Sequence, residues 1–202
     1  MPRKPRPKPK GVFCLEGDWS YKIHKASSVE PILTLLSKWD PYYVPYIHRD
    51  IATREELEYY LLRWTRKSLT RYPILYLAFH GDSERLLFGD VRYSRNTVTL
   101  DDVAGVLEGR CQGRIIYFAS CSTLKLHGNL IRRFLKRTGA LAVCGYRKEV
   151  DWLDATAFEL MVFGAMQRGS LTARGARAME RRIHRHAAYL ARRLEFRMVV
   201  RS

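Results

Sequence analysis

Three stretches of this sequence are continuously apolar and lack the alternation of apolar and polar residues seen in half-buried strands. They cover residues 72–79, 114–119 and 140–144. Strands buried on both faces have this pattern, which is typical of a parallel sheet covered by helices. Helical patterns follow these stretches at 99–108, 126–136 and 154–166. The alternation of strands and helices predicts a doubly wound α/β domain, a three-layer αβα sandwich around a largely parallel sheet.

Weaker signals extend this fold towards both ends of the chain. Thr99 and Asp102 have the spacing of a capping box, which marks the start of the helix at 99–108. The other expected elements are a strand at 11–15, a helix at 29–38, a strand at 42–47, a helix that begins at Thr53, a small hairpin of 86–90 with 97–99, and a basic C-terminal helix at about 174–195.

The net charge of +16 is concentrated at the two ends of the chain. Residues 1–10 carry five cations, four prolines and no acid, so we expect a disordered, extended arm. Residues 170–202 carry nine arginines and two acids. The rest of the chain is only mildly basic, and 11–202 is expected to form a single domain. The basic ends predict weak, sequence-independent binding of a polyanion, with nucleic acid as one candidate partner.

Several classes of protein are disfavoured by what the sequence lacks. It has no run of eighteen apolar residues, so we expect no membrane span. No apolar segment follows the basic residues 1–10, so we expect no secretory signal and a cytoplasmic location. The four cysteines form no C-x-x-C pair and no metal-ligand spacing, which predicts free thiols in a reducing compartment. We expect neither a metal nor a cofactor.

Two residues suited to catalysis follow the ends of two buried strands. His80 and Gly81 follow the stretch 72–79, and Cys121 follows the stretch 114–119. Because the carboxyl ends of parallel strands meet at one edge of a sheet, His80 and Cys121 are expected to face each other across a crevice. A thiol nucleophile and a proton-transfer partner need this arrangement.

The order of these pieces resembles that of the caspase-like (clan CD) cysteine peptidases, most closely their CHAT branch, which includes separase-like enzymes. The resemblance covers about residues 72–168 and consists of LAFHG at 77–81, IYFASCS at 116–122 and ALAVCG at 140–145, followed by the acidic loop 149–151. The chain departs from the caspase form Q-A-C-x-G around Cys121, because it has neither that Gln nor that Gly. We therefore do not expect the preference of caspases for cleavage after aspartate.

The resemblance implies a caspase-like fold and a mechanism. Cys121 attacks the scissile carbonyl, and His80 protonates the leaving amine. The backbone N–H groups of Gly81 and Cys121 form the oxyanion hole. A glycine at position 81 would let the backbone approach the substrate without a Cβ in the way. The sequence assigns no third catalytic residue.

Acidic residues near the same edge are candidates for binding the substrate. Several clan CD relatives that cleave after Arg or Lys hold that side chain with carboxylates. By resemblance, Asp151 is the leading candidate here, followed by Asp18, Glu149 and Asp154. A second interpretation is equally consistent with the sequence: Asp151 caps the following helix, with Asp154 in its first turn.

Other cysteines and histidines have simpler interpretations. Cys14 and Cys144 lie within apolar runs and are expected to pack in the core, whereas Cys111 looks incidental. His127 is an alternative partner for Cys121, but it lies on a predicted helix. The remaining histidines, expected at the surface, are His24, His48, His184 and His186.

Two functions follow from these patterns. The first is a cysteine endopeptidase acting on a protein or peptide substrate, which the resemblance further implies to be a prokaryotic defence or death effector. Its activity would be controlled by a regulatory partner, by self-association or by the basic arm. The alternative is a catalytically inactive caspase-like module whose basic ends contact nucleic acid or a protein partner.

Overall fold

In the computed structural model, residues 8–20, 22, 24–25, 27–40, 43–88, 96–125 and 128–201 are described. Within them, a six-stranded sheet has the order β2-β1-β3-β7-β8-β9. Its strands are β1 (Val12–Glu16), β2 (Tyr46–Asp50), β3 (Ile74–Ala78), β7 (Ile115–Phe118), β8 (Ala142–Tyr146) and β9 (Phe196–Val200). All pairs are parallel except β8 with β9. The α/β prediction is confirmed, and the three apolar stretches form the adjacent strands β3, β7 and β8.

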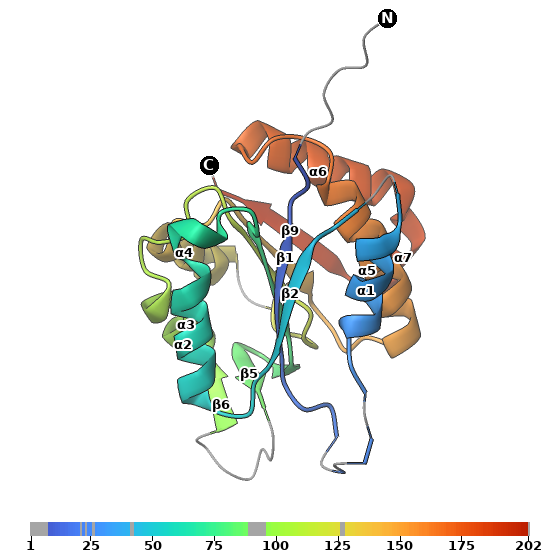
Figure 1. Cartoon of the computed structure of the whole chain (residues 1–202). Helices are drawn as coiled ribbons and strands as arrows, with labels where there is room; N and C mark the ends of the chain where they lie inside the picture. The colour runs from blue at the N-terminus through green and yellow to red at the C-terminus, as the bar shows by residue number, and fades with distance from the viewer. Residues whose placement is uncertain are drawn as a thin grey trace, which may run out of the picture.

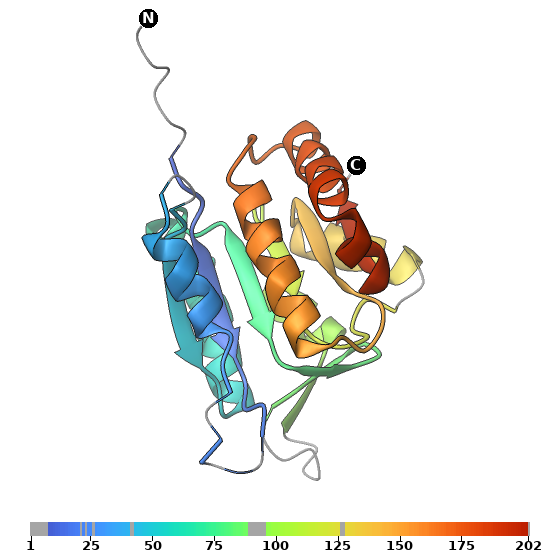
Figure 2. The same ribbon diagram turned by 90° about the vertical axis from the view of Figure 1, so that its right-hand side faces the viewer.

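Helices cover both faces of this sheet (Figures 1 and 2). One layer contains α1 (Glu30–Lys38), α5 (Trp152–Met166), α6 (Ala173–His186) and α7 (Ala188–Arg193). The other layer contains α2 (Arg54–Trp64), α3 (Leu100–Val106) and α4 (Gly128–Thr138). Two hydrophobic cores result, one on each side of the sheet. Tyr76 and Tyr117 point into the core beneath α5, whereas Leu77 and Phe118 point into the other.

Local capping signals fix the starts of two helices. Thr99 and Asp102 form the predicted capping box at α3, and Thr53, the predicted start of α2, forms another with Glu56. The predicted C-terminal helix is instead divided at Ala187, whose ψ of 36° interrupts the helix between α6 and α7. The apolar stripe continues across this break, so the sequence pattern does not reveal it.

The strands also differ from the prediction in two places. The strand expected at 42–47 lies at Tyr46–Asp50, immediately after Pro45, and residues 41–42 lie outside the described part of the chain. The final strand β9 was not expected. It pairs antiparallel with β8 and makes the sheet mixed.

A small antiparallel sheet lies beside the carboxyl ends of the main strands (Figure 1). Its described strands are β4 (His80–Asp82), β5 (Arg85–Leu87) and β6 (Thr97–Thr99). Pairing of β5 with β6 confirms the predicted hairpin, of which 89–95 lie outside the described residues. His80 belongs to β4 rather than to the end of β3, and Phe79 separates the two strands.

The basic arm meets the folded body at its last residue. The Lys10 backbone N–H donates to Gln167 Oε1 and the Lys10 ammonium donates to the Gln167 carbonyl, both at 2.8 Å. Lys10 is therefore buried at the end of α5 instead of solvated, whereas residues 1–7 lie outside the described part of the chain. Among the described helices, none combines the length and apolarity that crossing a membrane requires.

Candidate functional site

His80 and Cys121 line the same cavity, which has a volume of about 150 Å³. The cavity lies at the carboxyl ends of β3, β7 and β8, and the start of α5 closes its outer side. Cys121 is partly buried and His80 is exposed. The structure thus brings the two predicted catalytic residues to one site. The competing candidate, His127, lies outside the described residues.

The ring of His80 is oriented by Trp19. His80 Nε2–H donates to the Trp19 carbonyl oxygen at 3.1 Å, and the two rings meet edge to face with centroids 5.2 Å apart. Trp19 in turn packs edge to face on Trp152 of α5. Since Nε2 carries the hydrogen in this contact, the neutral ring has its free lone pair on Nδ1. The Trp19 carbonyl is a positioning group that the sequence could not identify.

Gly81 is packed against the loop that carries Cys121. A Cβ at position 81 would lie 2.5 Å from Thr123 Oγ1 and 2.7 Å from both the Cys121 carbonyl oxygen and Ser120 Cβ. Access of substrate to the backbone, the reason predicted for this glycine, stays a prediction, and the structure adds a second reason. The absence of a side chain lets β4 and the Cys121 loop approach each other.

The same loop is tied to the end of β8 by backbone hydrogen bonds. The Ser122 N–H donates to the Lys148 carbonyl and the Leu124 N–H to the Tyr146 carbonyl, each at 3.0 Å. Ser122 has a φ of 56°, a left-handed conformation that is uncommon for a residue other than glycine. The turn after Cys121 is held in this conformation by its neighbours, as strained residues at functional sites often are.

Cys121 differs from the other three cysteines in that it is only partly buried. Cys14, Cys111 and Cys144 are fully buried, which confirms the core positions predicted for Cys14 and Cys144. Burial raises the pKa of all three, and that of Cys111 to about 12. A thiol must lose its proton to be a strong nucleophile, so these three are poorly suited to attack.

The four predicted substrate-binding carboxylates lie outside the described lining of the cavity. Asp151 Oδ1 accepts from the N–H groups of Leu153 and Asp154 at 3.0 Å, so its capping role is confirmed. Asp154 pairs with Arg193 of α7. Asp18 and Glu149 are exposed.

The cavity instead contains a carboxyl group that the sequence analysis missed. Glu159 of α5 accepts from Tyr76 at 2.6 Å and from Tyr146 at 2.9 Å, and Tyr117 donates to the Tyr146 hydroxyl at 2.8 Å. Burial raises the pKa of Glu159 to about 7, although the tyrosine hydrogen bonds oppose the shift. The only signal in the sequence is an acid in the middle of an otherwise apolar helical segment.

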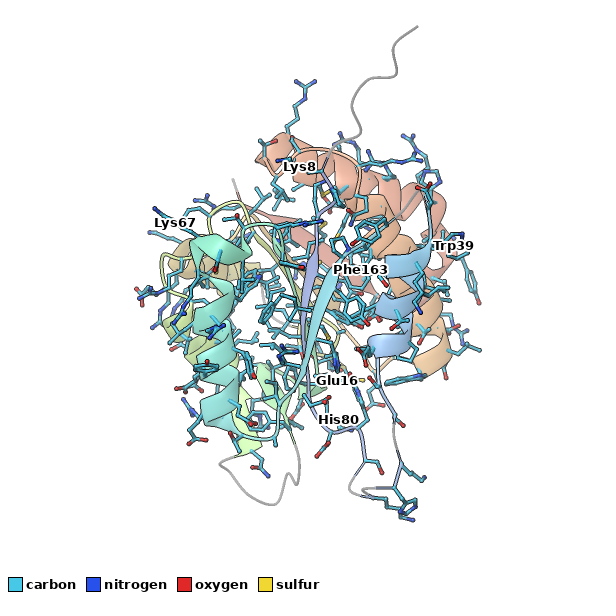
Figure 3. The ribbon with its side chains drawn as sticks, in the orientation of Figure 1. Lys8, Glu16, Trp39, Lys67, His80 and Phe163 are labelled. Atoms are coloured by element: carbon cyan, nitrogen blue, oxygen red, sulfur yellow. The ribbon has the colours of Figure 1, made fainter. Side chains whose placement is uncertain are left out.

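A second buried carboxylate lies beside Trp19. Glu16, at the end of β1, accepts from the Trp19 indole, from the Val29 N–H at 2.7 Å and from His48 Nε2 at 2.6 Å. His48 was predicted to be a surface residue, but only 11% of its side chain is exposed. Figure 3 shows Glu16 and His80 at the same end of the sheet. The other three histidines expected at the surface are exposed.

Glu16 and His48 form an ion pair. Burial raises the pKa of Glu16, but the hydrogen bonds it accepts outweigh burial and lower it. Burial lowers the pKa of His48, but the hydrogen bond and charge of Glu16 outweigh burial and raise it. Potential ligand atoms of Glu16, His48 and Asp50 lie within 4.8 Å of one another. We assign no metal there, because His48 Nε2 donates its hydrogen to Glu16 and has no lone pair left for a cation.

The shifted pKa values predict a stability that falls as the pH rises from about 5.5 to 8. The raised pKa of His48 stabilises the fold below the ordinary histidine pKa of about 6.5, and this stabilisation is lost as the pH rises. Glu159 changes the stability in the same direction, because its pKa of about 7 lies above the ordinary value of about 4.3. The lowered pKa of Glu16 has the opposite effect on stability: its stabilisation is lost as the pH falls below about 4.3. Urea unfolding at several pH values measures the change.

His48→Gln should flatten this pH dependence, whereas His24→Gln, a change at an exposed histidine, should leave it unaltered. A wild-type free energy of unfolding that is constant from pH 5.5 to 8 would contradict the assignment.

The fold and site together define an α/β protein with a mixed, mostly parallel sheet and a thiol–imidazole cavity at the carboxyl ends of its strands. Residues 9–200 match the family of unknown function DUF6642, and the chain belongs to that family. No curated protein matches the sequence.

Proposed function

We propose that this protein is a cysteine endopeptidase of the caspase-like type, with Cys121 as nucleophile and His80 as its proton-transfer partner. The observation that carries the proposal is the shared cavity: the one partly exposed cysteine and an imidazole that donates to the Trp19 carbonyl line the same small pocket. The other three cysteines are buried and have raised pKa values.

The reaction needs only these groups and water. Cys121 Sγ, as thiolate, attacks the scissile carbonyl carbon, and the carbonyl electrons move to oxygen beside the N–H groups of Gly81 and Cys121. The C–N bond then breaks, and the protonated His80 gives its proton to the leaving amine. Water, deprotonated by His80, hydrolyses the thioester and releases Cys121. The Trp19 carbonyl, which accepts from His80 Nε2–H, keeps the imidazole ring in place during both proton transfers.

Glu159 replaces Asp151 as the proposed determinant of substrate preference. It is an acid among the residues that line the cavity, whereas the Asp151 carboxylate binds the backbone of its own helix. A guanidinium that enters the cavity would favour the ionised form of Glu159 and form a charge-assisted contact. The proposed substrates are therefore proteins or peptides with Arg or Lys before the cleaved bond.

A peptide library varied at the residue before the cleaved bond tests this function. The wild type should prefer Arg and Lys at least tenfold over neutral residues. Glu159→Gln should remove most of that preference, and Asp151→Asn should keep it. Preference for an apolar or acidic residue would contradict the role of Glu159, and no cleavage of any library member would contradict the peptidase.

The biological setting belongs to the same proposal. The resemblance to CHAT-like domains supports a prokaryotic defence or death effector in the cytoplasm, controlled by a partner protein or by self-association.

One observation favours a different function, an inactive binding module for nucleic acid. Arg174, Arg177, Arg181 and Arg185 are exposed along α6, and the described residues give none of them an ion pair. Such a row neutralises a phosphate backbone without reading sequence. Salt-sensitive polynucleotide binding, combined with no peptide cleavage by the wild type, would select this alternative.

A further inference from the structure

The outer face of α5 is apolar although the rest of the described chain covers it only in part. Leu153, Ala157, Leu160, Met161 and Gly164 follow one another at helical spacing along this face. Leu153 is 73% exposed and Met161 is 40% exposed. A helix in the outer layer of a domain normally has polar residues on this side, and a helix that is apolar all round is normally buried.

The second half of this face, from Leu160 to Gly164, forms the floor of a groove. The groove has a volume of about 570 Å³ and is bounded by α1 on one side and α6 on the other. Figure 2 looks onto this layer, with α5 between α1 and the pair α6 and α7. Trp39, which ends α1 and is 58% exposed, lines the groove and lies at the outside of the molecule in Figure 3. The groove is separate from the cavity of Cys121 and His80.

The charged side chains that line the groove have one sign. Arg168, Arg182 and His186 line it, and none of the described lining residues carries a carboxylate. Arg182 is held in place by the carbonyls of Ala165 and Arg168, each at 3.0 Å. The occupant should therefore be apolar on one side and acidic at its edges.

We propose that this groove binds an acidic amphipathic helix of a partner protein. The groove follows the last two turns of α5, and the exposed Leu153 and Ala157 continue the apolar face for about two more turns towards the start of the helix. Helices bind in such grooves through apolar residues spaced three and four apart. A second copy of this chain would bring two basic rims together, and a flat lipid surface would not fill a recess between two helices.

The position of the groove suits a regulator. The apolar face of α5 begins at Leu153, next to Trp152, which lines the cavity of Cys121 and His80 and contacts Trp19. A helix bound in the groove and extended over Leu153 would therefore end beside the residues that orient His80. Binding to the groove does not depend on peptidase activity, so the two proposals can fail separately.

Selection from a phage-displayed library of random 18-residue peptides on the immobilised full chain tests the groove. The library does not favour any charge, so the proposal predicts enrichment of sequences with apolar residues at helical spacing and acidic flanks. A synthetic enriched peptide should bind wild type measurably in fluorescence anisotropy. Its binding should weaken at least tenfold in Met161→Glu, which puts an acid on the groove floor, and should also weaken with added salt.

Leu62→Glu is the matched control, because Leu62 is 44% exposed on α2 in the opposite layer. It should change peptide binding less than twofold, and circular dichroism should show both variants folded. Enrichment of basic or patternless peptides, no enrichment, or equal binding to Met161→Glu would overturn the proposal. The proposal would also be overturned if the chain formed a dimer that Met161→Glu abolishes. The same holds if it bound anionic vesicles, and not peptides, in a way that Met161→Glu abolishes.

Discussion

Replacing Cys121 with alanine is expected to reduce peptide cleavage by about a thousandfold or more, because the substitution removes the atom that forms the thioester. The fold should survive this change. Cys121 is only partly buried, and its loop is held by the main-chain contacts of Ser122 and Leu124 with the end of β8. Initial rates on an Arg-containing peptide, measured beside a thermal unfolding curve, separate loss of chemistry from loss of structure.

Cys144→Ala is the control for the loss of a thiol. Cys144 is fully buried in β8, so this variant should lose some stability through packing and keep its activity in the folded fraction. Wild-type cleavage by Cys121→Ala would exclude Cys121 as the nucleophile.

Gly81→Ala is expected to lower kcat/KM by about a hundredfold, since a displacement of about 1 Å at a reacting group can have that effect. The new Cβ would overlap the Cys121 carbonyl oxygen and Thr123 Oγ1, at 2.7 and 2.5 Å. Because one of these atoms belongs to the backbone, β4 and the Cys121 loop would have to separate, which changes the position of His80 relative to Cys121.

Gly105→Ala provides the same chemical change in a place without this conflict. Gly105 lies within α3. A Cβ at this position would meet only the flexible guanidinium of Arg137, at 3.2 Å. Alanine favours a helix over glycine by up to about 1 kcal/mol, so this variant should be at least as stable as the wild type and equally active. A Gly81→Ala variant with wild-type kcat/KM would show that the close contact of β4 with the loop is unimportant for activity.

The sequence predicts the parts of this molecule that depend on local patterns. Continuous apolar runs identify β3, β7 and β8, because strands covered on both faces have no polar side. The Asp151 cap can also be predicted, since its partners are two and three residues away. The same reasoning places His80 and Cys121 at one edge of the sheet.

The buried carboxylates could not be predicted in this way. Glu159 is stabilised by Tyr76, 83 residues away, and Glu16 by His48, 32 residues away. Without the tertiary fold, each looks like an ordinary charged residue. The prediction therefore selected Asp151 and Asp18, which follow strands, instead of the acid that lines the cavity.

The most direct test of the central claim is the site and rate of modification by an electrophilic peptide that ends in Arg. Mass-spectrometric mapping of the full chain should find the adduct on Cys121 and on none of the three buried cysteines. His80→Ala should slow the reaction at least tenfold, and His24→Ala, a change at an exposed histidine, should leave the rate unchanged. Modification spread over several cysteines, or an unchanged rate in His80→Ala, would contradict a catalytic pair of Cys121 and His80.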